Sequence, residues 1–543
     1  MRLFNQRHPH PEHALVPRPA ADLFQHSQMT MIYYSHDFGE FSGKPLNVAS
    51  HMFRKANRGV FSPYAHTNLG RRMAAGVEIL ERATNRYRKP AFGIESIVCA
   101  DDHVYAVQER VVAAKPFCQL IHFEKHAGQT SELSSKASPL KQPKLLIVAP
   151  YSGHYATLLR DTVRALLKHN DVYITDWENA RDVPLYMGNF SLEDYIQYLM
   201  DFAKLIGPNY HILGVCQPAV PVLAMTALLA AHDSKYQPLS MTLMGGPIDT
   251  RITPTKVNTL AKEKPIEWFS HSVIARVPHY YPGAFRAVCP GFLMLQGFMS
   301  LNIDAHMSSH QRLFEHLIHG DEDHADAHRR FYDEYRAVLD LPAKYFLDSV
   351  YTAFQKHLLP RGEMIWKGER VNTHAITKTA LMTVEGEKDD ISGVGQTHAA
   401  HTICPNIPQD KRAHLVQQGV GHYGVFNGRR WREHTAPAVS KFIWENDPLS
   451  HKSLKGPAPV FMIGENANVP LEGEEALSPP KASPVKKSAS LKEPLKSSAV
   501  KPKSAKAPTT KSAPQAGKQR KGPAKVKSAA NIAASAALKV KRA

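Results

Sequence analysis

Short apolar runs, separated by longer stretches with helical spacing, dominate the middle of the chain. The runs comprise residues 145–150, 171–177, 210–215 and 240–247. Short, mainly apolar runs are typical of strands that are buried on both faces of a sheet. The stretches between them, such as residues 192–206, repeat their apolar residues at the spacing of a helix. Because strands that alternate with helices are joined by right-handed crossovers, the pattern predicts an α/β protein with a mostly parallel, doubly wound sheet.

The alternation stops between about residues 253 and 378, where the chain is rich in Trp, Tyr and His and has helical spacing. Strand-like runs resume at residues 380–386 and 414–418. An insertion between core strands is a common place for a lid, so we predict a largely helical lid here. Upstream of the first buried run, the spacing predicts a helix within residues 63–87 and strands within residues 94–123.

The two ends of the chain lack this periodicity. Residues 1–33 are predicted to be a flexible extension and residues 34–450 the folded domain. Residues 451–543 are dominated by Lys, Ala, Ser and Pro toward the end, a composition that cannot bury a core, so we predict a disordered basic tail. From Lys481 onward the chain has 17 Lys and Arg but a single acidic residue, so this segment carries +16 of the formal charge of +18.

Because the positive charge lies in the tail, it does not describe the folded domain. The folded domain is close to neutral, so its composition does not indicate a nucleic-acid-binding fold. The tail could bind nucleic acid or another polyanion through phosphate contacts that do not depend on sequence. A disordered, solubilising extension explains the same composition equally well.

The cysteine count and the apolar runs indicate a soluble protein of a reducing compartment. The five cysteines are scattered and include no CxxC pair, so neither a disulfide framework nor a zinc ribbon is expected. No secretory leader and no apolar stretch of membrane-spanning length is recognisable. No HExxH, GxGxxG or P-loop pattern occurs in a suitable context, so we expect no metal and no nucleotide cofactor. We therefore expect a cytoplasmic protein.

Cys216 is the candidate nucleophile. It follows the buried run 210–215 and precedes an apolar, Ala- and Leu-rich helix. A sharp strand-to-helix turn of this kind exposes a nucleophile, and the helix N-terminus favours a thiolate. The backbone N–H of Gln217 would donate one hydrogen bond to an oxyanion. A buried structural cysteine remains the alternative on this segment alone, because Pro218 occupies the place of the usual second glycine.

Two further candidate catalytic residues follow core strands later in the chain. Asp389 comes directly after the run 380–386, and His422 follows the run 414–418 between two glycines. Nucleophile, acid and histidine in this chain order are typical of α/β hydrolases, with Cys216 attacking, His422 moving the proton and Asp389 orienting the imidazole. Asp390 competes with Asp389 for the acid role.

The turn after the first buried run, residues 150–154, lies where such folds place their second oxyanion donor. We predict the backbone of Ser152 for this role. His154 in the same turn is better explained as a histidine that hydrogen-bonds within its loop.

At these residues the sequence resembles the intracellular poly(3-hydroxybutyrate) depolymerases. The resemblance runs from about Tyr34 to Trp444 and is carried by KPAFGIES, KPFCQL, APYSGHYATLLRDTVR, VYITDW, VCQP, MGGPIDTR, FYDEYRAVLD, MTVEGEKDDISG and GHYGVFNGRRWRE. It implies the α/β-hydrolase fold for the catalytic domain and a Cys216–His422–Asp389 triad. It also implies cleavage of ester bonds in amorphous polyhydroxyalkanoate granules in the cytoplasm. A thioester on Cys216 could pass its acyl group to water or to a thiol such as coenzyme A.

Two other functions compete with this interpretation. Polyhydroxyalkanoate synthases also use a cysteine in this fold, but they resemble G-x-C-x-G-G at the turn, whereas this chain has Gln217-Pro218-Ala219 after Cys216. A granule- or nucleoid-binding protein that acts through the basic tail is the alternative from another class. The sequence leaves open the oligomeric state, the acyl acceptor and the preferred side-chain length of the polymer.

Overall fold

The computed structural model describes residues 20–57, 67–127 and 141–452. The predicted basic tail therefore lies almost entirely outside the described residues. Among the residues that are described, none of the helices has the length and apolar composition needed to span a bilayer.

A nine-stranded sheet forms the centre of the fold, in the order β1-β2-β3-β5-β4-β6-β7-β13-β14. Its strands are β1 (Ser96–Val98), β2 (Val104–Lys115), β3 (Cys118–Ala127), β4 (Lys144–Val148), β5 (Asp171–Trp177), β6 (Tyr210–Val215), β7 (Ser240–Met244), β13 (Ala380–Gly386) and β14 (Arg412–Gln417). From β5 to β14 all neighbours are parallel, whereas β1, β2 and β3 add an antiparallel edge. The prediction of an α/β fold with a mostly parallel sheet is confirmed.

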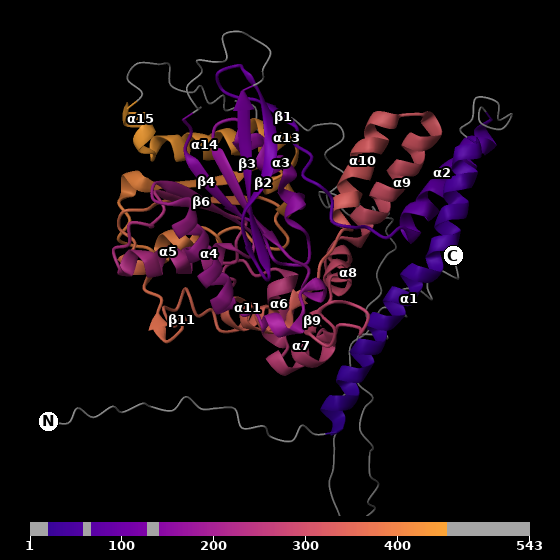
Figure 1. Cartoon of the computed structure of the whole chain (residues 1–543), viewed down its shortest axis with the longest axis horizontal. Coiled ribbons are helices and arrows are strands. Elements are labelled where there is room, and N and C mark those ends of the chain that lie inside the picture. Colours follow the sequence, from indigo (N-terminus) through magenta and orange to yellow (C-terminus); the bar gives the residue numbers. More distant parts are fainter. Residues whose placement is uncertain (1–19, 58–66, 128–140, 453–543) are drawn as a thin grey trace, which may run out of the picture. The chain divides into compact units, whose positions relative to one another are not determined.

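Three of the buried strands begin and end where the predicted runs do, whereas β4 and β7 end earlier than predicted. Strands β5, β6 and β13 have the bounds that the sequence predicts, and every residue of β6, β7 and β13 is buried. A strand with neighbours on both edges and helices on both faces is buried along its whole length and is therefore mainly apolar. Helices α4 (Leu192–Ile206) and α5 (Ala219–Ala231) lie on one face of the sheet, and α3 (Arg160–Leu167) and α14 (Ala436–Glu445) lie on the other (Figure 1).

The insertion between β7 and β13 is largely helical, as predicted. Its helices are α6 (Lys256–Glu263), α7 (Ile266–Ser272), α8 (Gly291–Leu301), α9 (Ile303–His319), α10 (Glu322–Tyr335) and α11 (Ala343–Ser349), the last continuing into a π-helical turn, Val350–Gln355. It also contains the short strands β8 (Ala275–Arg276), β9 (Ala287–Cys289), β10 (Leu341–Pro342), β11 (Ile365–Trp366) and β12 (Glu369–Arg370). Beyond β13 lie the short helices α12 (Ala399–Ile403), α13 (Gly428–Arg430) and α15 (Pro448–Lys452).

The N-terminal part of the chain differs from the prediction. Helix α1 (Ala20–Asn57) begins inside residues 1–33, which the sequence predicts to be a flexible extension. Tyr33 is buried and its hydroxyl donates a hydrogen bond to the buried carboxylate of Asp340. Because this partner is about 300 residues away in the chain, local periodicity gives no sign of it. Helix α2 (Asn68–Thr84) falls within the predicted helix 63–87 and packs against α1 and α9.

Candidate active site

Cys216 occupies a sharp turn between β6 and α5. Its backbone φ is +66°, a left-handed conformation that residues other than glycine seldom adopt. The turn is held by hydrogen bonds from Cys216 N–H to the carbonyl of Met244 (2.7 Å) and from Ala219 N–H to the carbonyl of Cys216 (3.1 Å). Cys216 is half-buried, whereas Cys99, Cys118, Cys289 and Cys404 are buried. The predicted strand-to-helix turn is therefore present, and its cysteine is accessible.

The prolines after Cys216 fit the start of the helix. The first backbone hydrogen bond of the helix runs from Val222 N–H to the carbonyl of Pro218, at 2.9 Å. Pro218 and Pro221 both precede that first donor. The N–H groups of a first helical turn have no partner within the helix, so a proline there removes no hydrogen bond.

The segment after β7 passes very close to this turn. A Cβ at Gly246 would lie 2.1 Å from the Cβ of Ala219 and 3.1 Å from the carbonyl oxygen of Cys216. A residue with a side chain cannot occupy this position without displacing the turn. Thr397 fixes the same segment, because its hydroxyl donates to the carbonyl of Gly246 (2.9 Å) and accepts from the N–H of Gly246 (2.8 Å).

His422 and Asp389 form a buried pair. The distance from His422 Nδ1 to Asp389 Oδ2 is 2.7 Å, and the two side chains are 5% and 0% exposed. The other oxygen of Asp389 accepts hydrogen bonds from the backbone N–H groups of Ile391 (2.9 Å) and Ser392 (2.8 Å). A Cβ at Gly245 would lie 3.3 Å from His422 Cε1, so the missing side chain leaves room for the imidazole.

The charges around His422 favour its protonated form. Burial by itself would lower the pKa of the imidazole. The negative charges of Asp389 and Cys216, with hydrogen bonds to both groups, outweigh burial and raise the pKa of His422 well above its usual range. His422 thus contacts Asp389 and lies close enough to Cys216 for the two charges to interact. Such an arrangement can move a proton between a thiol and an imidazole that is oriented by a carboxylate.

Asp390 points to a different partner. Asn302, which lies between α8 and α9 of the insertion, donates a hydrogen bond from its side-chain amide to the Asp390 carboxylate. Asp389 is thus the carboxylate that contacts His422, and Asp390 connects the insertion to the loop that carries Asp389.

The segments of the two predicted oxyanion donors meet at Tyr345. This buried residue of α11 donates a hydrogen bond from its hydroxyl to Gln217 Oε1, at 2.6 Å. Its ring lies 5.2 Å from the ring of Tyr151, the residue before Ser152. Tyr345 therefore contacts both the turn after β6 and the turn after β4.

His154 lies in the turn after β4 but has a structural environment. It is buried, and one ring nitrogen bonds to the backbone carbonyl of Tyr335 at 3.0 Å. Burial lowers its pKa to about 4, so the ring is neutral at physiological pH. This agrees with the interpretation of His154 as a hydrogen-bonding loop histidine.

Sequence reasoning missed the residues that reach the site from the insertion. They are Tyr345, Asn302 and Tyr335, whose ring lies 5.4 Å from that of Tyr423. Tyr423, the neighbour of Tyr335, could have been found from the sequence, since it directly follows the predicted His422. The others come from a region whose helical spacing shows which residues share a face but not which distant segment that face contacts.

Among the described residues, two groups of histidine and acidic side chains could hold a metal ion by distance alone. They are His316, Asp321 and His324, and His36, Asp37 and Glu40. Neither group includes a predicted site residue. Asp321 caps α10 by accepting from the backbone of His324, and Asp37 accepts from the hydroxyl of Tyr280 at 2.6 Å. Ordinary hydrogen bonds thus explain both groups.

The parallel sheet, the strained turn after β6 and the acid and histidine after β13 and β14 define an α/β hydrolase. Residues 245–447 match the family described as PHB de-polymerase C-terminus, where PHB is poly(3-hydroxybutyrate). This part of the chain is similar to the PHB depolymerase family. The matched residues include Asp389 and His422 and begin after Cys216. No curated protein matches the chain.

Several solved structures are similar in fold at low identity. A monoacylglycerol lipase from Paleococcus ferrophilus is 12% identical with a TM-score of 0.35, and the match covers 57% of this chain and 97% of the lipase. An esterase from Thermogutta terrifontis is 11% identical with a TM-score of 0.34, over 63% of this chain and 99% of the esterase. A bromoperoxidase from Bacillus anthracis is 12% identical with a TM-score of 0.34, over 62% of this chain and 99% of the bromoperoxidase.

Proposed function

We propose that the protein is an intracellular depolymerase that cleaves ester bonds of poly(3-hydroxybutyrate) through Cys216, His422 and Asp389. The observation that carries the proposal is the buried His422–Asp389 pair beside a cysteine in a left-handed turn, in a chain that is similar to the PHB depolymerase family. Intracellular action on stored granules is supported by the five free cysteines, which suit a reducing compartment.

Acylation begins with the Cys216 proton on His422, so that the thiolate Sγ attacks an ester carbonyl carbon beside an imidazolium. The tetrahedral intermediate collapses when the bond to the alkoxy part of the polymer breaks, and His422 gives that oxygen its proton. Asp389 stabilises the imidazolium that exists between the two transfers. The product is a thioester on Cys216 and a shortened polymer chain with a free hydroxyl.

Deacylation repeats the sequence with a new nucleophile. His422 takes a proton from water, the water oxygen attacks the thioester carbonyl, and Cys216 leaves and regains its proton. The product is 3-hydroxybutyrate or one of its oligomers. A thiol such as coenzyme A can replace water, because thioesters exchange with thiols, and the product is then an acyl thioester. The N–H groups of Gln217 and Ser152 would stabilise the oxyanion in both halves.

The decisive experiment combines alkylation with polymer hydrolysis. Iodoacetamide should label Cys216 in the native protein before the four buried cysteines, and labelling should abolish release of 3-hydroxybutyrate from amorphous granules. Cys216→Ala should lower the release by at least about a thousand-fold. The matched control is Cys404→Ala, which removes a buried cysteine distant from the triad and should keep most of the activity.

The outcomes separate the alternatives. Activity retained in Cys216→Ala would refute the proposed nucleophile. Chain growth from a 3-hydroxybutyryl thioester, without hydrolysis, would instead identify a synthase-like acyltransferase. Binding of nucleic acid or another polyanion by the tail remains a prediction, since the tail lies outside the described residues.

A further inference from the structure

Helix α1 exposes a continuous stripe of apolar side chains. Its members recur every three or four residues, which places them on one side of a helix. The stripe consists of Met31, Tyr34, Phe38, Phe41, Pro45, Val48 and Met52, with Ile32, Leu46 and Phe53 beside it. Phe38, Phe41 and Met52 are 70%, 67% and 66% exposed. From Met31 to Met52 the stripe is about 30 Å long at the rise of an α-helix.

Polar contacts hold the opposite side of α1 against the protein. Tyr33 bonds to Asp340, and Asp37 accepts a hydrogen bond from Tyr280. Glu40 pairs with Arg86 at 3.2 Å, and the side-chain amide of Asn47 donates to the carbonyl of Glu81 at 2.8 Å. These contacts orient the helix so that most of the stripe is exposed, whereas Tyr34 at one end bonds to His279 of the insertion at 3.1 Å.

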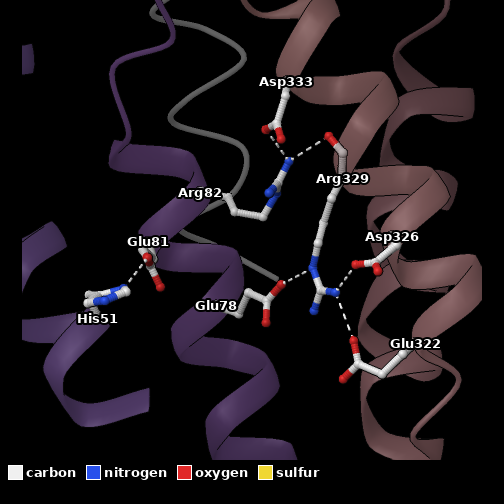
Figure 2. Close-up of polar contacts among 8 residues, drawn as sticks. All are labelled: His51, Glu78, Glu81, Arg82, Glu322, Asp326, Arg329 and Asp333. Atoms are coloured by element: carbon white, nitrogen blue, oxygen red, sulfur yellow. Dashed lines mark hydrogen bonds and ion pairs between the residues drawn. The ribbon is translucent and has the colours of Figure 1, made fainter. Parts of the chain in front are cut away.

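Helix α2 extends the apolar surface and joins it to the insertion. Leu69, Met73 and Leu80 of α2 are exposed. Figure 2 shows the other side of α2 facing α10. There Arg329 Nε forms an ion pair with Glu78 Oε1, and Arg82 Nη2 forms one with Asp333 Oδ1, each at 2.7 Å. The pair α1–α2, here called the arm, is therefore attached to the helices that adjoin the active site.

We propose that the arm binds the surface of the solid polyester and holds the enzyme there. This inference rests on the proposed function, because it takes the polymer as the partner. A polyester surface carries neither charge nor hydrogen-bond donors, and no member of the stripe is charged. An exposed apolar patch of this extent on a soluble protein marks an interaction site.

A second copy of the chain fits the stripe less well. The three- and four-residue spacing resembles a coiled-coil seam, in which each position inserts a side chain between four residues of the partner. Pro45 occupies a seam position in the middle of α1, and Gly39 lies beside the seam. A proline ring and a missing side chain suit a flat partner better than interdigitation.

The test uses the full-length protein with Phe38, Phe41 and Met52 all replaced by Gln. We expect co-sedimentation with amorphous poly(3-hydroxybutyrate) particles to weaken at least about ten-fold. Hydrolysis of the particles should fall in parallel, whereas hydrolysis of a soluble 3-hydroxybutyrate dimer should change less than about two-fold. The matched control replaces the exposed Val98, Val104 and Val111, at the far antiparallel edge of the sheet, by Thr and should leave every measurement unchanged.

Unchanged particle binding by the α1 variant would overturn the proposal. A change from dimer to monomer in light scattering, with particle binding retained, would overturn it in favour of a copy-to-copy interface. A photo-crosslinker at position 38 that captures residues 1–19 or 453–543 of the same chain in the presence of particles would also overturn it. Failure of the proposed function looks different: wild type would bind particles through the arm and release no 3-hydroxybutyrate.

Discussion

At the scale of single residues, two adjacent carboxylates differ in what they can do. Asp389 lies 2.7 Å from His422 and is fully enclosed, whereas Asp390 bonds to Asn302 of the insertion. We predict that Asp389→Asn lowers kcat/KM for polymer hydrolysis by about 10³ to 10⁴-fold, because the amide cannot stabilise an imidazolium. Asp390→Asn should lower kcat/KM for polymer hydrolysis by less than about ten-fold. Equal losses in the two variants, measured side by side, would contradict the assignment of Asp389.

Tyr345 should act as a positioning residue for the oxyanion donors. Its hydroxyl reaches Gln217 and its ring lies against Tyr151 and Tyr195. We predict that Tyr345→Phe keeps the ring packing and lowers kcat about ten-fold at nearly constant KM. Steady-state kinetics on a soluble ester would measure this split. An unchanged kcat would show that the Gln217 side chain needs no support from Tyr345.

The candidate site could be predicted in part from the sequence. Cys216 directly follows β6, and Asp389 and His422 lie in the loops after β13 and β14. The carboxyl ends of parallel strands meet at one edge of a sheet. The contacts of Tyr345 and Asn302 could not be predicted. Both residues lie in a helical insertion, and their partners depend on how that insertion folds back over the sheet.

At the scale of elements, the same reasoning explains which boundaries could be predicted. Strands β5, β6 and β13 are mainly buried because they are covered on both faces, and their ends coincide with the predicted runs. The edge strand β2 alternates between half-buried and exposed residues and is harder to delimit. Helix α1 is absent from the prediction, although its apolar residues recur every three or four positions. Its outer side is apolar and exposed, while its inner side makes polar contacts. This distribution reverses the usual pattern of an amphipathic helix.

The crossing of the β7 loop with the turn after β6 gives a test at this scale. Gly246→Ala would place a methyl group 2.1 Å from the Cβ of Ala219. We expect a loss of about 1–3 kcal/mol in the free energy of unfolding and a severe loss of activity, since the turn that carries Cys216 must move. Gly297→Ala in α8 is the control, because a Cβ there meets no atom within 4 Å. It should be neutral or stabilise by about 0.5–1 kcal/mol, as judged by urea unfolding.

At the scale of the whole molecule, distant segments are joined by buried polar groups rather than by apolar surface alone. Tyr33 meets Asp340, and His154 meets Tyr335, so the arm and the β4 turn are both tied to the insertion. A buried polar group is tolerated only while its partner is present. Changes that ionise such a group should therefore loosen the contacts between segments, and pH is the simplest way to produce them.

Acid should destabilise the protein through histidines that are held neutral. Burial is the main cause that lowers the pKa of His154, His169, His310 and His401 to about 4 each. In the unfolded chain the pKa values of these histidines are near about 6.5, so below that pH the unfolded chain binds more protons than the folded one. The free energy of unfolding therefore falls as the pH drops from about 6.5 toward about 4. The raised pKa of His422 acts in the opposite sense: its contribution is complete below about 6.5 and is lost at higher pH.

His154 allows the effect to be isolated, because it is almost fully buried and has a single defined partner. Between about pH 7 and about pH 5, His154 is protonated only in the unfolded state, which should lower the free energy of unfolding by about 2 kcal/mol. His154→Gln keeps a donor for the carbonyl of Tyr335 but cannot ionise, so its unfolding free energy should fall by about 2 kcal/mol less than that of wild type over this interval. His374→Gln, at an exposed site, should follow wild type. Urea titrations at the two pH values measure the difference, and parallel curves for all three proteins would mean that His154 is already protonated in the folded state.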